Sequence, residues 1–167
     1  MQLGLKPFGI DAVRRMEELG IIVDVSHLSD GGFWDVAKHT KVPFVASHSC
    51  CRALCDDGRN LTDEMLRIIG NRGGVCGINF YSGFLNKGSR YTAVEDIVRH
   101  AKHVANMAGV DAVALGSDFD GIGNELEFGD YAGMPMIAEG LRSCVTDDEV
   151  EKICWGNTLR VIREVIG

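Results

Sequence analysis

The chain has 167 residues, of which 46% are hydrophobic and six are cysteine, and a formal net charge of −7 at pH 7. This length predicts one domain, and the acidic balance argues against a nucleic-acid partner, which would require a basic surface. No apolar run reaches the roughly 18 residues of a membrane span, and the first residues contain no signal-peptide core. The cysteines form no CxxC pair, so we expect reduced thiols and a cytoplasmic location.

Apolar periodicity and capping residues predict helices alternating with strands. Thr62 is an expected N-cap, and Thr92-x-x-Glu95 and Thr146-x-x-Glu149 are expected capping boxes. Such alternation implies parallel βαβ units, and four strands make half of a closed (β/α)₈ barrel. We therefore predict an α/β fold, a single partial (β/α) barrel domain over residues 1–167. In chain order, we expect a helix over 8–19, a strand over 21–25, a helix over 31–40, a strand over 44–47, a helix over 63–71, a strand over 74–80, a helix over 93–108, a strand over 112–116 and a helix over 147–165.

Three of these strands are followed by side chains that suit metal-dependent hydrolysis. His27 and His48 lie 21 positions apart, each after an apolar run, and Asp118 follows the last predicted strand. Because the chemistry of β/α barrels lies at the carboxyl ends of the strands, the three should converge at one mouth. Two imidazoles and a carboxylate there favour a metal-dependent hydrolase. The plainer alternatives are that His27 caps the following helix or is hydrogen-bonded at a strand end, and that Asp118 caps the loop after its strand.

Several short motifs in fixed order make the pattern more specific. They are Gly4–Gly9, Asp24–His27, Ser47–Ser49, Arg59–Asp63, Gly74–Phe80, Gly116–Gly121 and Gly156–Val161. Together they resemble the membrane (renal) dipeptidase family of zinc metallopeptidases, and specifically the C-terminal half of that family's domain. The resemblance implies an amidohydrolase-type β/α barrel, of which this chain would supply the last four strands, around a two-zinc site.

The resemblance also implies roles for individual residues. His27 and His48 correspond to two ligands of one zinc ion, and neutral imidazole is a good zinc ligand. Asp118 corresponds to the acid–base that serves the attacking water and the leaving amine. Arg59 corresponds to the arginine that receives the terminal carboxylate of a dipeptide substrate, which a planar guanidinium matches with two hydrogen bonds. Asp120, before Gly121, is interpreted as turn chemistry.

Part of the family's site is not found in this sequence. The family also uses a His-x-Asp pair, a bridging glutamate and a further histidine, and no His-x-Asp occurs here. Because a four-stranded sheet leaves two edges open, we expect a partner, either a second copy of the chain or the N-terminal half of the barrel. Two alternatives remain, a non-catalytic half-barrel that binds a metal or a partner, and another amidohydrolase-type metal hydrolase.

The remaining conspicuous residues are expected to be structural. Cys50 and Cys51 lie close to His48 but are interpreted as packing residues rather than ligands. His100 and His103 share one helix face, which we expect to be partly exposed. The aromatic side chains of Phe33, Trp34 and Trp155 are expected in the core, and 124–136 is expected to form a surface loop.

Overall fold

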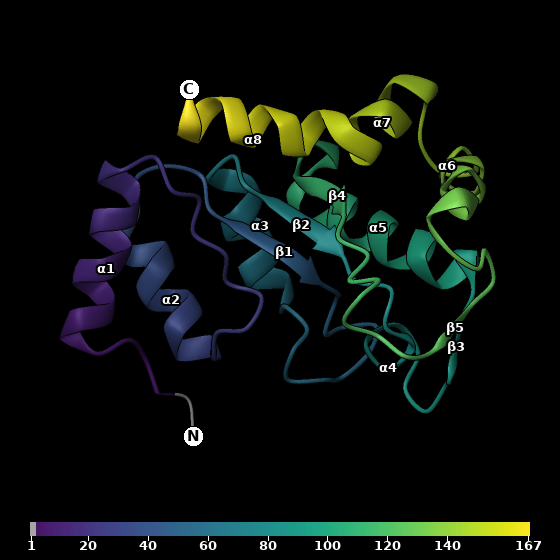
Figure 1. Cartoon of the computed structure of the whole chain (residues 1–167), viewed down its shortest axis with the longest axis horizontal. Helices are drawn as coiled ribbons and strands as arrows, with labels where there is room; N and C mark the ends of the chain where they lie inside the picture. Colours follow the sequence, from purple (N-terminus) through teal and green to yellow (C-terminus); the bar gives the residue numbers. More distant parts are fainter. Residues whose placement is uncertain (1–2) are drawn as a thin grey trace.

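The computed structural model describes residues 3–167 and centres on a parallel three-stranded sheet in the order β1-β2-β4 (Figure 1). The strands are β1 (Val45–Ser49), β2 (Val75–Ile78) and β4 (Val113–Leu115). Val45 pairs with Val75, and Cys76 pairs with Val113. Because all three strands run in the same direction, their carboxyl ends share one edge, as in a barrel. The predicted parallel α/β fold is therefore confirmed, as an open sheet rather than a closed barrel.

Helices surround this sheet, with α3 and α5 behind it and α8 running along the top of the view (Figure 1). None of the described helices combines the length and apolarity needed to cross a bilayer. The helices are α1 (Pro7–Glu18), α2 (Asp30–His39), α3 (Asp63–Asn71), α4 (Ser82–Leu85), α5 (Val94–Ala108), α6 (Met134–Leu141), α7 (Asp147–Glu151) and α8 (Asn157–Ile166), with a π-helical segment at Lys152–Gly156, 3₁₀ turns at Val110–Ala112 and Tyr131–Gly133, and a small parallel pair formed by β3 (Tyr91–Thr92) and β5 (Glu125–Leu126).

Alternate residues of each strand pack into two apolar clusters, as the pleat of a strand requires. One set, including Ala46, Cys76 and Val113, joins the large core formed with α2, α3 and α5. The other set, Val75 and Ala114, packs with Val161 of α8 in a smaller cluster. The sheet is therefore covered on one face by helices and, on the other, partly by the last helix.

Helix α8 is fastened to the end of the sheet where the strands begin. The Asn157 side chain donates to the carbonyls of Val110 and Val113 at 2.9 and 2.8 Å. Arg160 donates to the carbonyls of Gly73 and Asp111 at 2.6 and 3.0 Å. These carbonyls precede or open β2 and β4, so α8 closes this end and leaves the carboxyl ends of the strands for the site.

The predicted strand over 21–25 is reduced to a single bridge. Asp24 pairs with Val45 in parallel, and backbone bonds of 2.8–2.9 Å join Val45 to Val23 and Val25. The chain then turns, with the Leu28 amide donating to the Val25 carbonyl. The prediction of a regular strand here was wrong because this edge pairs on one side only among the described residues and turns immediately afterwards.

Capping predictions had mixed outcomes. Thr62 accepts from the Met65 amide, and Thr146 forms the expected capping box with Glu149. The Thr92 box was wrong, because the Thr92 hydroxyl donates instead to the Phe80 carbonyl at 2.8 Å. The first turn of α5 is capped from elsewhere in the chain, by the Glu127 carboxylate, which accepts from the Val94 amide at 2.7 Å.

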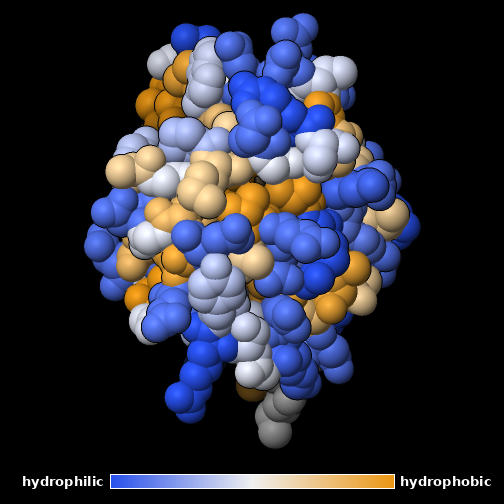
Figure 2. All heavy atoms as spheres, turned by 90° about the vertical axis from the view of Figure 1, so that its right-hand side faces the viewer, coloured by the Kyte–Doolittle hydropathy of each residue, from blue (hydrophilic) through white to orange (hydrophobic). Residues whose placement is uncertain are grey.

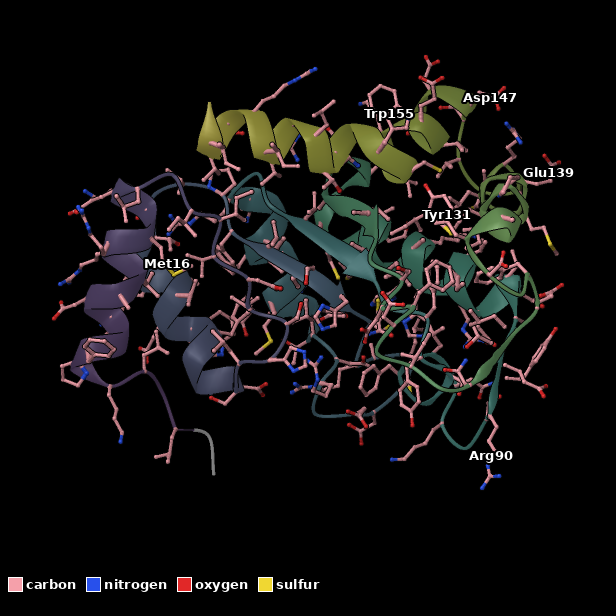
Figure 3. The ribbon with its side chains drawn as sticks, in the orientation of Figure 1. Met16, Arg90, Tyr131, Glu139, Asp147 and Trp155 are labelled. Carbon is pink, nitrogen blue, oxygen red and sulfur yellow. The ribbon has the colours of Figure 1, made fainter. Side chains whose placement is uncertain are left out.

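The C-terminal third departs from expectation in two further ways. Trp155 was expected in the core but is 56% exposed, on the π-helical segment that interrupts the predicted long helix (Figure 3). The expected loop 124–136 instead includes β5, a 3₁₀ turn and the start of α6. Figure 2 shows the face of the molecule at this end, where hydrophobic atoms form a band between hydrophilic ones.

His100 was expected on a partly exposed helix face, but its side chain is fully buried. Its Nδ1 accepts from the Cys51 amide and its Nε2 lies 3.0 Å from the Leu85 carbonyl, to which it donates as the neutral Nε2–H tautomer. Burial lowers the pKa of His100 to about 4, against an ordinary value of 6.5. His100 is thus a structural link between the loop after β1 and α4.

The buried His100 predicts an acid-sensitive fold. Between pH 6.5 and about 4 the unfolded chain binds a proton at His100 that the folded chain does not, so the free energy of unfolding should fall as the pH drops through this window. His100→Gln should remove on the order of 2–3 kcal/mol of this pH dependence in urea unfolding. His39→Gln, at the end of α2, should retain it. Parallel pH profiles for wild type and His100→Gln would contradict the assignment.

Candidate metal and substrate site

Two imidazoles meet where β1 ends. The Nε2 atoms of His27 and His48 are 2.9 Å apart, with the ring centroids separated by 4.9 Å and the planes inclined at 56°. His27 is held on the turn that precedes α2, and His48 is the fourth residue of β1. The structure therefore brings together the two histidines that the sequence analysis selected. The helix-capping alternative for His27 is wrong, because Ser29 caps α2.

A β-bulge in β1 directs the His48 side chain toward His27. The register of β1 against β2 shifts between Ala46 and Ser49, which pair with Cys76 and Ile78, so β1 contains one extra residue. Bulges of this kind redirect a side chain next to a site. Burial lowers the pKa of His48, and the Asp118 and Asp24 carboxylates oppose this shift only in part. The ring is therefore neutral at neutral pH, the state that metal binding requires.

The Asp24 carboxylate lies behind His48 and gathers several hydrogen bonds. Its Oδ1 accepts from the Ser26 amide at 3.0 Å, the Ser26 hydroxyl at 2.8 Å and the Ser47 amide at 3.0 Å. Its Oδ2 accepts from the Ser47 hydroxyl, whose Oγ is 2.7 Å from His48 Nδ1. Desolvation acts to raise the pKa of Asp24, but the hydrogen bonds from Ser47 and Ser26 outweigh it and lower the pKa.

Asp118 occupies the position just beyond β4 in a conformation rarely adopted by residues with a side chain. Its φ is 68°, in the left-handed region. Asn79, fully buried after β2, donates through Nδ2 to Asp118 Oδ2 at 3.1 Å. A Cβ at Gly121 would lie 2.2 Å from Asp118 Oδ1, so only glycine permits the observed carboxylate position. The exposed Asp120 lies in the turn between them, as expected.

Arg59 and Asp118 face the same cavity as His27. The cavity has a volume of about 230 Å³, and Tyr81 and Phe84 also line it. The Arg59 guanidinium carbon is 5.5 Å from the centroid of the Phe84 ring, and its buried Nη1 has no hydrogen-bond partner among the described residues. An unpaired buried cationic donor is costly unless an acceptor reaches it. The cavity can therefore receive an anionic group.

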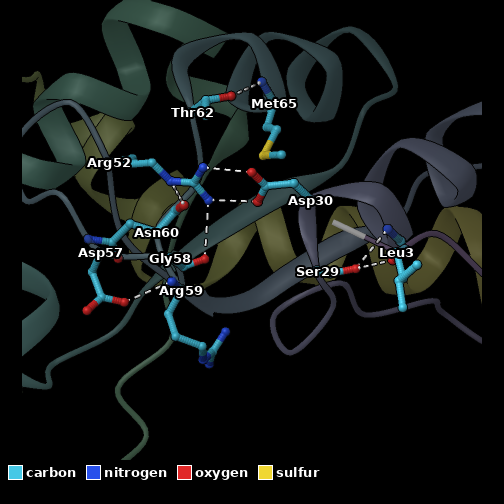
Figure 4. Close-up of polar contacts among 11 residues, drawn as sticks. Leu3, Ser29, Asp30, Arg52, Asp57, Gly58, Arg59, Asn60, Thr62 and Met65 are labelled. Atoms are coloured by element: carbon cyan, nitrogen blue, oxygen red, sulfur yellow. Dashed lines mark hydrogen bonds and ion pairs between the residues drawn. The ribbon is translucent and has the colours of Figure 1, made fainter. Parts of the chain in front are cut away.

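A second arginine fixes the loop that carries Arg59 (Figure 4). Arg52 makes a bidentate pair with Asp30 at the start of α2, with both N–O distances 2.8 Å. It also donates to the carbonyls of Asn60 and Gly58, on either side of Arg59. The side chain of Arg59 points away from this cluster, so the ion pair shapes the loop and leaves Arg59 free for the cavity.

The donor set fits part of a metal site. Two convergent imidazole nitrogens suit a divalent transition metal such as zinc, which takes three or four protein ligands. No group of three or more histidine, cysteine or acidic side chains arranged for a metal occurs within residues 3–167. Cys50 and Cys51 are buried in the core, and burial raises the pKa of both thiols, so neither supplies a thiolate. The described residues therefore offer two convergent imidazoles and a nearby carboxylate.

Several residues of the site escaped the sequence analysis. Asp24, Ser47 and Asn79 lie within the quoted motifs but were given no role, and Tyr81 and Phe84 lie outside those motifs. The available signal was the presence of polar residues at the ends of otherwise apolar strands. Their partners across the sheet could not be inferred without the register.

Comparisons with known proteins agree with this geometry. A family model described as membrane dipeptidase, Peptidase family M19, matches residues 1–166. The chain is 45% identical to a Klebsiella pneumoniae protein described as "Uncharacterized protein in pqqA 5'region", and 37% identical to dipeptidase tcpJ of Claviceps purpurea, each over 97% of this chain. A metallo peptidase of Rhodobacter sphaeroides, solved with a phosphinate mimic of the dipeptide L-Ala-D-Ala, superposes with a TM-score of 0.91 at 33% identity over 97% of this chain.

The chain is shorter than the proteins it matches. It spans 61% of the Klebsiella protein, 39% of the Claviceps dipeptidase and 47% of the Rhodobacter peptidase. The high TM-score shows that the open sheet and its helices are arranged as in the corresponding part of a longer metallopeptidase.

The bidentate Arg52–Asp30 pair predicts that lysine cannot replace Arg52. Arg52→Lys should lower the free energy of unfolding at pH 7 by about 1–2 kcal/mol, because an ammonium cannot match both oxygens and both loop carbonyls. Hydrogen bonding to Arg52 lowers the pKa of Asp30 below 3.8, so the difference should shrink as the pH falls through and below that value. Arg142→Lys, whose ion pairs with Glu139 and Asp147 are exposed, is the matched control and should change little. Equal losses for the two variants in urea unfolding would contradict the role of Arg52.

Proposed function

The chain belongs to the membrane dipeptidase family, Peptidase family M19, and we propose from this that it takes part in the metal-dependent hydrolysis of dipeptides. The observation that carries the proposal is the meeting of His27 and His48 at 2.9 Å beside a cavity lined by Arg59 and Asp118. These four residues come from segments far apart in the sequence: β1, the turn before α2, the loop after β1 and the segment after β4. His27, Arg59 and Asp118 line one small cavity, and His48 contacts His27 beside it, which suits a hydrolytic site.

His27 and His48 would hold a zinc ion through their Nε2 atoms. A zinc ion in such a site supplies Lewis acidity and makes water a nucleophile near neutral pH. The lowered pKa of His48, caused by burial, keeps its imidazole neutral and available as a ligand.

Asp118 would act as the general base and acid. Its carboxylate lines the same cavity as His27 and is held in place by the amide of Asn79. A carboxylate so placed can accept a proton from the attacking water and return it to the nitrogen of the leaving amine. The left-handed backbone of Asp118 is the kind of local strain that gathers at functional positions.

Arg59 would bind the free carboxylate of the substrate. Its buried Nη1 lacks a partner among the described residues, and its guanidinium packs against Phe84. A charged, bidentate hydrogen bond there favours a peptide whose carboxylate lies one residue from the scissile bond. A cavity of about 230 Å³ suits a small substrate rather than a folded chain.

The ligand set visible here is a partial one, so we also propose that the active assembly includes further protein. The described residues give two metal ligands, fewer than the three or four that zinc takes. The remaining ligands would come from the other half of the barrel or from a second copy of the chain. This proposal agrees with the spans of 39–61% that the chain covers in its curated relatives.

A non-catalytic half-barrel that binds a metal or a partner is the alternative function. The specific observation in its favour is the lack of a third metal ligand within residues 3–167. It predicts a metal or partner complex without turnover.

Zinc content and dipeptide hydrolysis, measured together with the mass of the assembly, test the proposal. We expect zinc binding that is lost in both His27→Ala and His48→Ala, and chelator-sensitive cleavage of Ala-Ala or Gly-D-Ala by the assembly that contains the remaining ligands. His39→Ala is the control, because His39 lies on α2 outside the cavity. Zinc binding that survives both substitutions would refute the metal site. Zinc binding with no turnover in any assembly would establish the non-catalytic alternative.

Arg59→Ala tests the carboxylate-binding role. Hydrolysis of dipeptides with a free carboxylate should fall by about 10²-fold in kcat/KM, equivalent to the roughly 3 kcal/mol of a charge-assisted hydrogen bond. Cleavage of the corresponding dipeptide amides should change little, since they offer no anion. Equal losses for acids and amides would rule out recognition of the carboxylate by Arg59.

A further inference from the structure

A chain of hydrogen bonds connects Asp24 to His48 through Ser47. We propose that Asp24, acting through the Ser47 hydroxyl, is a positioning residue that fixes His48 as the Nδ1–H tautomer and keeps its Nε2 lone pair directed at the metal position. The inference rests on the proposed function, in which His48 is a metal ligand. It assigns a role to two residues that neither touch the cavity nor reach the metal position.

The protons can be placed by counting donors and acceptors. An ionised Asp24 carboxylate only accepts, so its hydrogen bond with the Ser47 hydroxyl uses the single hydroxyl proton of Ser47. Ser47 Oγ is then an acceptor toward His48 Nδ1, 2.7 Å away, and Nδ1 must carry a proton. A neutral imidazole protonated at Nδ1 has its lone pair at Nε2. The carboxylate therefore selects the tautomer that a metal needs.

Ser47, the middle residue of this chain of hydrogen bonds, is held in place by its surroundings. A Cβ at Gly77 or at Gly116 would lie 2.1 Å from the Ser47 carbonyl oxygen, so β2 and the segment just after β4 approach Ser47 as closely as glycine permits. The next amide, that of His48, donates to the Ser26 hydroxyl at 3.0 Å. The same Ser26 hydroxyl donates to Asp24. Backbone and side-chain contacts thus hold Ser47 between the carboxylate and the imidazole.

His27 is held differently. No hydrogen bond to its Nδ1 occurs among the described residues, and its Nε2 faces His48 Nε2. With the His48 lone pair at Nε2, the 2.9 Å contact requires His27 to donate its Nε2 proton in the metal-free chain. His48 is therefore already in the tautomer that binds a metal, while His27 must move its proton to Nδ1 when a metal binds.

Replacing Asp24 by asparagine should reverse the direction of the hydrogen bonds that run from residue 24 through Ser47 to His48. Three donors meet at Oδ1, two from Ser26 and one from the Ser47 amide, so the oxygen of the introduced carboxamide must take that position. Its NH₂ group then faces Ser47 Oγ and donates to it. The Ser47 hydroxyl turns its proton toward His48 Nδ1, which becomes an acceptor. His48 is left as the Nε2–H tautomer, with no lone pair for a metal.

The test reads the tautomer and the zinc affinity separately. Long-range ¹H–¹⁵N NMR of the zinc-free chain should show His48 protonated at Nδ1 in the wild type and at Nε2 in Asp24→Asn. Zinc affinity, measured by competition with a chromogenic chelator, should fall by about 10–100-fold in Asp24→Asn. Ser47→Ala, a second variant, should leave a mixture of tautomers and a similar loss.

Ser143→Ala is the matched control, because it removes a serine hydroxyl whose hydrogen bond, to the Gly140 carbonyl, lies outside the Asp24–Ser47–His48 chain of hydrogen bonds. It should keep the Nδ1–H tautomer and lose less than about threefold in zinc affinity. An Nε2–H tautomer in the wild type, or an unchanged tautomer in both Asp24→Asn and Ser47→Ala, would overturn the inference. If the wild type shows the expected tautomer but binds no zinc, the proposed function is wrong, whereas the inference that Asp24 sets the His48 tautomer through Ser47 is retained.

Discussion

Parallel pairing of β1, β2 and β4 is the constraint on which the site depends. Because the three strands run in one direction, every residue that follows a strand emerges at the same edge of the sheet. His48 is the last residue but one of β1, Asn79 follows β2 and Asp118 lies just beyond β4. An antiparallel arrangement of the same strands would place alternate members at opposite ends of the sheet, about 10–15 Å apart for strands of three to five residues. Topology, more than any single contact, therefore assembles the chemistry.

Hydrogen bonds from neighbouring side chains decide how each functional group at this edge is oriented. Asp24 and Ser47 stand behind His48, Asn79 holds the carboxylate of Asp118, and Arg52 fixes the loop of Arg59. Each supporting residue satisfies a polar group that would otherwise be costly to desolvate. Side chains would not fit at Gly77 and Gly116, which approach the Ser47 carbonyl, or at Gly121, which approaches the Asp118 carboxylate. The site is therefore shaped by residues that do no chemistry themselves.

The sequence predicted those parts of the fold that local patterns determine. The helix at Asp63–Asn71 was located at both ends, because an N-cap and an amphipathic repeat mark it. The Thr92 box failed because a distant carboxylate, on Glu127, competes for the same helix terminus. His100 was placed on the wrong side of its helix because its burial depends on the loop after β1, which carries no periodic signal. The motifs located His27, His48, Arg59 and Asp118, whereas their supporting residues depend on a strand register that no local pattern encodes.

The attachment of α8 has a consequence for the order in which the chain can complete its fold during synthesis. The carbonyls at the starts of β2 and β4 receive their side-chain donors from Asn157 and Arg160, up to 87 residues downstream. A ribosome delivers those residues well after both strands, so the carbonyls at the starts of β2 and β4 stay open to water until α8 emerges. Synthesis in this direction therefore leaves the base of the sheet to be closed only after the histidines at its other end have been made.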